Sequence, residues 1–411
     1  MQPTLTTPLL THTELDALGA SADAVLPAFL EDLARLVNVD CGSYTKTGVD
    51  TIGRWVAEEF QNLGGSVAVE PHPTLGDTVV GEFGGADPDG PTLLLIGHMD
   101  TVFDEGTAAQ RPFRIDGGLA YGPGVTDMKG GLLTGLYALR VLRDALGGIP
   151  ARRIVYVANP DEEIGSPTSS PIISRFARDA DACLVLECAR ANGDIVSSRK
   201  GILDARVTIH GRAAHAGVEP EKGRNAIEEA ARIVRDVHAL NGRWPGVTLN
   251  VGVIRGGTRP NVVAEQCMLE LDVRAVTAES QDAVTAEIRR IVEATVVPDV
   301  TVELETMATW RPMEKLERSG RLVEHAVELA GRLGFGLKDA ATGGASDANT
   351  TSGLGVPTID GLGPIGGNDH APGEYLEVGS IVPRTTLLAA LIATIGRDPD
   401  VRRWRGRGST A

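Results

Sequence analysis

Residues 93–102 read LLLIGHMDTV, an apolar run that ends in a glycine and then presents His98 and Asp100. The run 92–96 predicts a buried strand. Because side chains alternate along an extended chain, His98 and Asp100 point to the same side of it. Ligands of open α/β sheets gather at the carboxyl ends of strands. A single histidine there can also be a structural residue, so its meaning depends on the segments that follow.

Strand and helix patterns alternate on both sides of this run. Strands are expected at 153–157 and 182–186 and helices at 130–146 and around 30–37, with Pro27 in the first turn of the latter. This rhythm is typical of an α/β fold with a largely parallel sheet covered by helices.

After Lys200 the pattern changes to β-α-β-β-α-β, which predicts a ferredoxin-like α+β domain. Its strands are expected at 203–209, 248–254, 267–273 and 301–305, and its helices at 225–240 and 281–292. The α/β pattern returns after Pro312, with helices at 321–333 and 383–395. We therefore expect a catalytic domain formed by 1–199 and 312–411, with the domain 200–311 inserted.

Length and charge narrow the classes of partner. A chain of 411 residues exceeds the usual size of one hydrophobic core, and its net charge of −16 would repel nucleic acid and anionic lipid. We expect no apolar run long enough to span a bilayer. The four cysteines predict buried thiols, and an N-terminus without the build of a secretory signal predicts a cytoplasmic protein. The basic tail from Arg402 predicts a frayed end.

The glycine-rich stretch YGPGVTDMKGG, residues 121–131, places Asp127 just before a predicted helix. A phosphate-binding loop is the obvious rival interpretation. However, the GxGxxG pattern needs glycine where Asp127 stands, and Lys129 is followed by glycine instead of the Ser or Thr of a Walker motif. Asp127 read alone could equally be a helix cap.

Carboxylates follow the next two predicted strands. Asp161, Glu162 and Glu163 come directly after 153–157, and Glu187 follows 182–186. Crowded carboxylates at the end of a buried strand are costly unless a cation neutralises them or one is protonated, although a solvated loop is the plainer alternative. Successive strand ends thus present His98, Glu163 and Glu187 towards one rim.

His370 lies late in the chain, in the polar turn GGNDHAPGEYL. Two histidines and three carboxylates suit a pair of borderline cations. Zinc fits this donor set best, and manganese or cobalt would also accept it. Asp127, between the others in chain order, is the candidate bridge between two ions.

These motifs, HMDTV, YGPGVTDMKGG, PDEEIGS, HGRAAHAG, GGASDA and DHAPGEY, occur in order over nearly the whole chain. The chain thereby resembles the M20 family of zinc exopeptidases and amidohydrolases, most closely its glutamate carboxypeptidases. The resemblance implies His98 and Glu187 on one zinc, Glu163 and His370 on the other, and Asp127 bridging both. It also implies Glu162 as general base and Asp100 as the partner that orients His98.

The inserted domain carries His210 and His215 in IHGRAAHAG. The resemblance selects His215 as a donor to the tetrahedral intermediate, which in dimeric relatives acts across the subunit interface. His210 keeps its reading as a surface histidine. The resemblance thus implies a lid that closes on the substrate, and a homodimer through the inserted domain.

Arg274, Asn261 and Arg311 match residues that bind substrate carboxylates and carbonyl groups in the glutamate carboxypeptidases, and Gly344 completes the expected substrate-binding set. A surface ion pair is the alternative for each arginine. A substrate with a free carboxylate is implied. The chain departs from the family pattern at Arg259, Lys200 and Met128, which puts a preference for a glutamate side chain in doubt.

We therefore expect a dinuclear zinc hydrolase that cleaves an amide or peptide bond and releases a C-terminal, acidic amino acid. An N-acyl amino acid deacylase of the same family is the nearest alternative. A metal-binding protein without catalysis is a more distant one, and the presence of Glu162, which has no ligand role in this assignment, argues against it.

Overall fold

The computed structural model describes residues 9–401, so the basic tail from Arg402 lies outside the described residues. The chain divides into two compact units. The smaller unit comprises Ser198–Glu314 and Thr342–Ala345, and the larger unit contains the rest. The expected limits of the inserted domain, 200 and 311, fall just inside the first of these segments.

The second segment of the smaller unit, Thr342–Ala345, was expected in the catalytic domain instead. It joins the smaller unit through hydrogen bonds to the chain near residue 200. The amide of Lys200 donates to the carbonyl of Thr342 (3.2 Å), and Arg199 donates to the carbonyl of Gly344 (3.2 Å). Contacts between segments so far apart in the chain leave no local pattern in the sequence.

A six-stranded sheet forms the centre of the larger unit, in the order β1-β2-β6-β3-β7-β14. Strands β3, β6, β7 and β14 are parallel to their neighbours in this set, whereas β1 and β2 are antiparallel. The strands are β1 (Ser66–Glu70), β2 (Thr78–Gly84), β3 (Thr92–His98), β6 (Arg153–Asn159), β7 (Ala182–Val185) and β14 (Thr358–Ile359). The predicted mixed, largely parallel sheet is confirmed.

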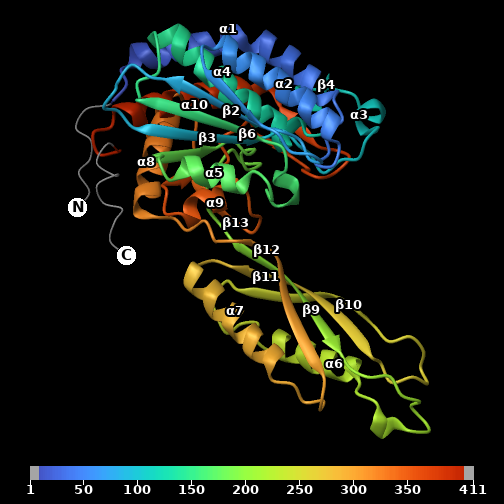
Figure 1. Ribbon diagram of the computed structural model, residues 1–411. Coiled ribbons are helices and arrows are strands. Elements are labelled where there is room, and N and C mark those ends of the chain that lie inside the picture. The colour runs from blue at the N-terminus through green and yellow to red at the C-terminus, as the bar shows by residue number, and fades with distance from the viewer. Residues whose placement is uncertain (1–8, 402–411) are drawn as a thin grey trace. The chain divides into compact units, whose positions relative to one another are not determined.

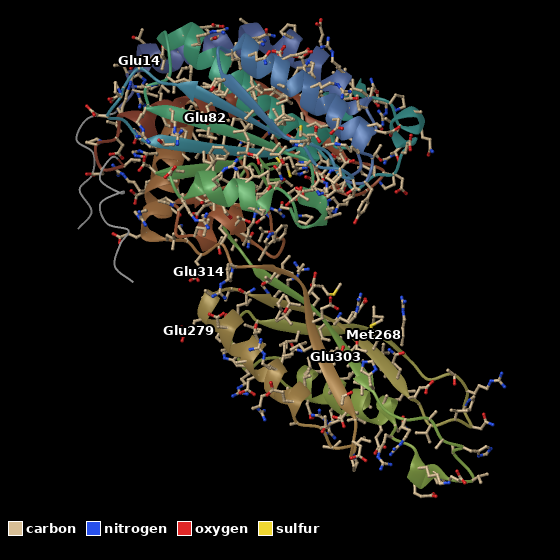
Figure 2. The ribbon with its side chains drawn as sticks, viewed as in Figure 1. Glu14, Glu82, Met268, Glu279, Glu303 and Glu314 are labelled. Carbon is tan, nitrogen blue, oxygen red and sulfur yellow. The ribbon has the colours of Figure 1, made fainter. Side chains whose placement is uncertain are left out.

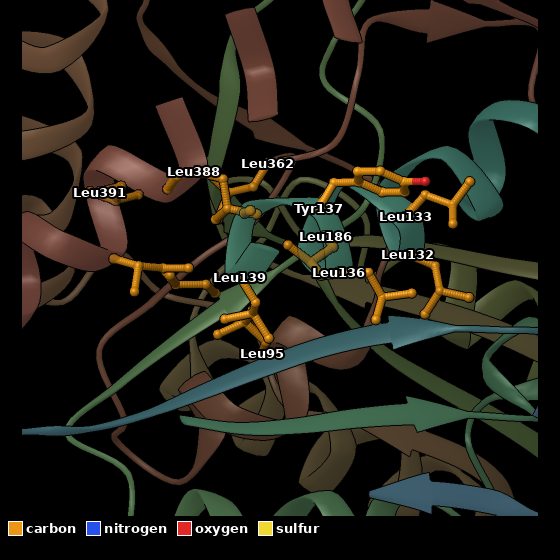
Figure 3. Packing of buried hydrophobic residues seen from close by; sticks show 14 of the residues in the cluster. Leu95, Leu132, Leu133, Leu136, Tyr137, Leu139, Leu186, Leu362, Leu388 and Leu391 are labelled. Carbon is orange, nitrogen blue, oxygen red and sulfur yellow. The ribbon is translucent and has the colours of Figure 1, made fainter. Parts of the chain in front are cut away.

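Helices cover both faces of this sheet (Figure 1). On one side lie α1 (His12–Val37), α2 (Lys46–Asn62), α4 (Gly130–Leu146) and α10 (Ile381–Arg397), and on the other α5 (Ser170–Ala177) and α9 (Asp347–Gly353). Helix α8 (Glu317–Arg332) packs on α10 and β14. Figure 3 shows the core between α4, α10 and the sheet, where Leu95, Leu136 and Leu388 are buried among other leucines.

Two expectations about helices are wrong. Helix α1 begins fifteen residues before Pro27, because Thr11 and Glu14 form a capping box there and a continuous buried face from Leu15 to Leu36 offsets the hydrogen bond that the proline lacks. Val378–Arg397 is apolar and long enough to span a bilayer, but 78% of its most apolar 18-residue window is buried, as in the core helix of a globular domain.

The smaller unit is an antiparallel sheet in the order β10-β11-β9-β12, with two helices. Its elements are β9 (Gly201–His210), α6 (Ala226–His238), β10 (Thr248–Gly256), β11 (Gln266–Ala275), α7 (Ala278–Glu293) and β12 (Thr301–Trp310). This is the ferredoxin-like order. The carboxylate of Glu314, labelled near Glu279 in Figure 2, accepts from the amide of Ala278 at the start of α7 (2.9 Å).

A small sheet in the larger unit, β15-β16-β5-β4, supports the late loop that carries His370. Its strands are β4 (Arg114–Asp116), β5 (Leu119–Tyr121), β15 (Gly366–Gly367) and β16 (Tyr375–Glu377). The structure also has the short helix α3 (Thr107–Gln110), the strand pair β8 (Ile195–Arg199) and β13 (Asp339–Thr342), and four short helical turns at Val125–Lys129, Glu162–Ile164, Pro220–Lys222 and Val378–Ser380. Because β5 leads into the Asp127 segment and β15 into the His370 loop, this sheet joins two distant parts of the predicted site.

Candidate metal centre

The seven predicted site residues of the larger unit all lie near the carboxyl ends of β3, β6 and β7, which are neighbours in the sheet. His98 ends β3, Glu162 and Glu163 follow β6, and Glu187 follows β7. Asp127 precedes α4, and His370 lies between β15 and β16. Parallel strands bring these ends together at one edge, as expected from the sequence.

Asp127 faces two histidines with its two carboxylate oxygens. Its Oδ1 lies 3.1 Å from His98 Nε2, and its Oδ2 lies 3.2 Å from His370 Nε2. His370 Nε2 is also 3.1 Å from Glu163 Oε2, and His98 Nε2 is 3.7 Å from Glu187 Oε1. One carboxylate thus separates two donor sets, the arrangement required of a bridge between two cations.

The donor chemistry fits divalent cations. Ligand atoms of His98, Asp127 and Glu163 all lie within 4.8 Å of one another, as do those of His98, Glu162 and Glu187. Glu163 Oε1 is buried and has no hydrogen-bond partner among the described residues. A buried carboxylate oxygen without a donor is costly unless a cation meets it, and imidazole with carboxylate is a donor set that zinc accepts.

The electrostatics show how strongly these groups are coupled. Burial opposes the charged imidazole of His98, yet its hydrogen bonds to Asp100 and Asp127 hold its pKa well above the usual value. Hydrogen bonds to Asp127 and Glu163 raise the pKa of His370 to about 10. Burial raises the pKa of Glu163. Concentrated negative charge therefore attracts cationic partners at this edge, which favours protons or metal ions alike.

Asp100 holds His98 differently from the expectation. The nearest acceptor for His98 Nδ1 is the backbone carbonyl of Asp100 (3.0 Å), and the carboxylate lies farther away (3.4 Å). The carboxylate accepts instead from Ser43 Oγ (2.6 Å) and from the amides of Glu162 (3.1 Å) and Glu163 (3.2 Å). With Nδ1 donating to the carbonyl, Nε2 is free to bind metal.

Glu162 is buried beside His98 and Glu187. Burial raises the pKa of its carboxyl well above the usual value. A carboxylate with a raised pKa can take and return a proton at neutral pH. Ligand atoms of Glu162, His98 and Glu187 lie within 4.8 Å of one another, so Glu162 could serve as a ligand as well as a base.

Sequence reasoning missed Glu374, which lies four residues after His370. Its buried carboxylate accepts from the amides of Gly124 (2.8 Å), Thr126 (2.9 Å) and Asp127 (3.0 Å). It therefore ties the Asp127 segment to the His370 loop. The sequence could have indicated this role, because Glu374 belongs to the DHAPGEY motif. An acidic residue near one ligand can accept hydrogen bonds from backbone amides next to another ligand.

His215 lies in the smaller unit. Its Nδ1 accepts from the amide of Gly217 (3.2 Å), which leaves the proton of a neutral ring on Nε2. A hydrogen-bond donor at Nε2 is what the predicted role requires. His210, 3.8 Å from Glu303, keeps the reading of a surface histidine.

The predicted substrate-binding residues also belong to the smaller unit. Arg274 forms an ion pair with Asp272 (2.6 Å), and Arg311 binds the carboxylate of Asp282 through two nitrogens. Each arginine thus has the surface ion pair that was the alternative reading. Asn261 and Arg259 are exposed in the loop between β10 and β11, and Gly344 is exposed beside Arg199.

Comparisons with known proteins find a family, related sequences and a related structure that each match most of this chain. The sequence model of peptidase family M20/M25/M40 matches residues 94–394. The chain is 33% identical to carboxypeptidase G2 of Pseudomonas sp. (strain RS-16) over 379 residues, which cover 90% of each chain. It is 27% identical to acetylornithine deacetylase of Proteus mirabilis (strain HI4320), covering 89% of this chain and 96% of that one. The crystal structure of aminopeptidase PepT from Bacillus cereus ATCC 10987 superimposes with a TM-score of 0.75 at 24% identity, covering 90% and 98% of the two chains.

Proposed function

Because this chain belongs to peptidase family M20/M25/M40, whose enzymes are metal-dependent, we propose that it is a dinuclear zinc hydrolase that releases a C-terminal, acidic amino acid from an amide or peptide bond. The observation that carries the proposal is the carboxylate of Asp127, which faces His98 with one oxygen and His370 with the other. A carboxylate that faces one histidine with each of its oxygens has the geometry that a bridge between two ions needs.

In this proposal His98 and Glu187 would hold one cation, Glu163 and His370 would hold the other, and Asp127 would contact both. When bound, the cations would lower the pKa of a water molecule and polarise the scissile carbonyl. Manganese or cobalt could replace zinc at these ligands.

The protein's own groups move the protons. Glu162, buried and with a raised pKa, accepts the proton of the attacking water and returns it to the leaving amine. His215 would donate from Nε2 to the developing oxyanion, and the carbonyl of Asp100 favours the tautomer of His98 whose Nε2 could bind a cation.

The substrate class follows from the relatives and from the cationic residues of the smaller unit. Carboxypeptidase G2, by its name, removes a C-terminal residue, which favours carboxypeptidase activity here. Arg274 and Arg311 are the candidates for binding a substrate carboxylate. Both would exchange their present partners, Asp272 and Asp282, for the substrate.

A second candidate, an N-acyl amino acid deacylase, is favoured by the similarity to acetylornithine deacetylase. The two are separated by hydrolysis rates for one acyl group on all C-terminal residues and for many acyl groups on one residue. Rates that follow the terminal residue, with acidic ones fastest, support the carboxypeptidase, and rates that follow only the acyl group support the deacylase.

Metal removal tests the centre itself. Dialysis against a chelator should abolish hydrolysis, and zinc should restore it as two equivalents bind per chain, because both donor sets must be filled. Metal analysis alongside the rate assay measures this. Activity that persists without metal, or full activity with one equivalent, contradicts the dinuclear proposal.

The variant Glu162→Gln tests whether Glu162 acts as a general base or as a metal ligand. As a base, Glu162 should be dispensable for binding two zinc ions while the variant loses roughly 10²–10⁴-fold in kcat. Loss of one zinc ion together with activity would make Glu162 a ligand instead. Retained activity with both zinc ions bound would contradict the role of Glu162 as the general base.

We also propose a cytoplasmic homodimer. All four cysteines are free thiols, which suits a reducing compartment. The edge strands β10 and β12 of the smaller unit are largely exposed along their length, and an exposed edge can pair with a second copy. Sedimentation equilibrium of the wild type, and of a variant with proline in β10, tests the dimer.

A further inference from the structure

A buried carboxylate, Asp347, binds both ends of the turn that carries Glu162 and Glu163. Its Oδ2 accepts from Asn159 Nδ2 (2.7 Å), and its Oδ1 accepts from Ser166 Oγ (2.5 Å). Asn159 is the last residue of β6, and Ser166 follows the short helix Glu162–Ile164. The side chain of Asp347 therefore closes the base of a loop whose tip carries the proposed general base and a proposed ligand.

The turn needs such support because its far end is strained. Gly165 and Ser166 both have positive φ, 93° and 51°. Glycine adopts positive φ freely, whereas a serine with positive φ is strained and keeps this conformation only where its surroundings hold it. The amide of Ser166 donates to the carbonyl of Asp161 (2.8 Å), and its hydroxyl donates to Asp347.

Asp347 is itself held in place. It is the first residue of α9, and Ser346 caps that helix by accepting from the amide of Ala348 (3.1 Å). The hydroxyl of Ser346 donates to Asp360 (2.7 Å), which follows β14 at the edge of the central sheet. Asp347 is 1% exposed, so its two hydrogen bonds operate away from water, where they are strongest.

Asp347 lies close in sequence to a segment of the smaller unit. Thr342–Ala345 belongs to the smaller unit, and Asp347 follows it by two residues.

We propose that Asp347 is a positioning residue: by holding Asn159 and Ser166 it fixes the turn 160–165, and so the places of Glu162 and Glu163. The roles given to these two glutamates rest on the proposed function. The two hydrogen bonds that join Asp347 to the turn do not depend on the proposed function.

Amide hydrogen exchange on the full chain tests, without any substrate or metal, whether Asp347 stabilises this turn. The amides of Glu162, Glu163, Gly165 and Ser166 are all hydrogen-bonded and should exchange slowly. In Asp347→Ala we expect these amides to exchange at least about tenfold faster, with the rest of the larger unit unchanged, because local opening releases only this turn.

Asp398→Ala is the matched control. Asp398 is another fully buried carboxylate of the larger unit, bonded to His325 Nε2 (2.7 Å) at the end of α10. Its loss should leave exchange in the turn as in wild type. Equal acceleration of the turn in both variants, or none in Asp347→Ala, overturns the proposal.

Two milder variants keep the test available if Asp347→Ala does not fold. Ser166→Ala removes one of the two hydrogen bonds and should accelerate exchange of Gly165 and Ser166. Asp347→Asn should behave like wild type within a few-fold, because its oxygen can accept from Asn159 while the serine hydroxyl accepts from its amide. Unchanged exchange in Ser166→Ala, or turn opening in Asp347→Asn as large as in Asp347→Ala, contradicts the proposed pair of bonds.

Kinetics and metal binding then measure how an open turn affects turnover and zinc affinity. Asp347→Ala should lower kcat about 10–100-fold with KM within about threefold of wild type, and weaken zinc binding against a competing chelator. Wild-type kcat in a variant whose turn has opened would show that the turn does not need positioning. A wild-type protein that neither binds zinc nor hydrolyses amides defeats the proposed function but leaves the exchange result intact.

Discussion

At the scale of the residue, Asp100 performs two tasks with two different groups. Its backbone carbonyl faces His98 Nδ1, and its carboxylate accepts from Ser43 and from the amides of Glu162 and Glu163. A single buried residue thus orients a ligand from one sheet strand and the turn from the next. Partners of this kind affect metal affinity nearly as strongly as the ligands themselves.

Asp100→Asn should therefore weaken zinc binding and lower kcat/KM about 10–100-fold, because the new amide group would face a backbone N–H that needs an acceptor. Titration against a competing chelator and steady-state kinetics measure both effects. Ser43→Ala, which removes one hydrogen bond and leaves the acceptors for both amides, is the matched control and should have a smaller effect. Wild-type zinc affinity in Asp100→Asn would contradict this account.

At the scale of the element, helix α4 approaches the sheet closely enough to place Asp127 at the strand ends. A Cβ on Gly131 would lie 1.7 Å from the carbonyl oxygen of Leu186, and one on Gly135 would lie 2.6 Å from the hydroxyl of Tyr156. Only glycine permits this approach. Leu186 precedes the ligand candidate Glu187, so the same contact sets the spacing of two parts of the metal centre.

Gly131→Ala should destabilise the protein by about 1–3 kcal/mol, since backbone atoms must move to admit the methyl group. Gly320→Ala on α8 is the control. A Cβ there meets nothing within 4 Å, and the change should stabilise by about 0.5–1 kcal/mol. Urea unfolding gives both values, and a neutral Gly131→Ala would show that α4 can shift freely.

Helices α1 and α10 are joined at their ends by one ion pair. Glu14, labelled at the start of α1 in Figure 2, lies 2.9 Å from Arg397 in the last turn of α10. The hydrogen bond to Arg397 outweighs desolvation and lowers the pKa of Glu14 to about 2. A carboxyl whose folded pKa is depressed adds stability above its unfolded pKa, and loses it as the pH falls towards the folded value.

Wild type should therefore be more stable than Glu14→Gln at pH 7, by about 0.2–1 kcal/mol for an ion pair so close to solvent, and this difference should shrink below pH 4.5. Glutamine can keep the capping hydrogen bond, so the charge is tested alone. Urea unfolding at pH 7, 5 and 4 measures the trend. Glu31→Gln, at an exposed position on α1, should show no such dependence; a gap that widens in acid would contradict the assignment.

At the scale of the whole molecule, the two units have separate hydrophobic cores. One cluster spans α1, α4, α10 and the central sheet, and the other lies between the four-stranded sheet and helices α6 and α7. All five ligand candidates lie in the larger unit. Metal binding should therefore stabilise only that unit, by mass action.

Calorimetry of the full chain should show two unfolding transitions, of which a chelator lowers only one. Val207→Ala, in the core of the smaller unit, should lower the other by about 2 kcal/mol and leave the chelator-sensitive transition in place. A single transition that moves as a whole in both experiments would mean that the units unfold together.

The sequence by itself determined the fold class, most element positions and the identity of the clustered ligand candidates. Helix α4 begins and ends at the expected residues, Gly130 and Leu146, and β3, β6 and β7 begin at the predicted residues 92, 153 and 182. Periodicity and glycine are local signals, and the rule that parallel strands share one edge needs no coordinates.

Only the tertiary structure decided how these residues are held. Glu374 reaches Asp127 across 247 residues, and Asp347 reaches Asn159 across 188. The start of α1 before Pro27, and the place of Thr342–Ala345 in the smaller unit, likewise depend on packing and on pairing with distant backbone. Hydrogen bonds between segments so far apart in the chain are formed by the fold as a whole, so no local pattern of residues announces them.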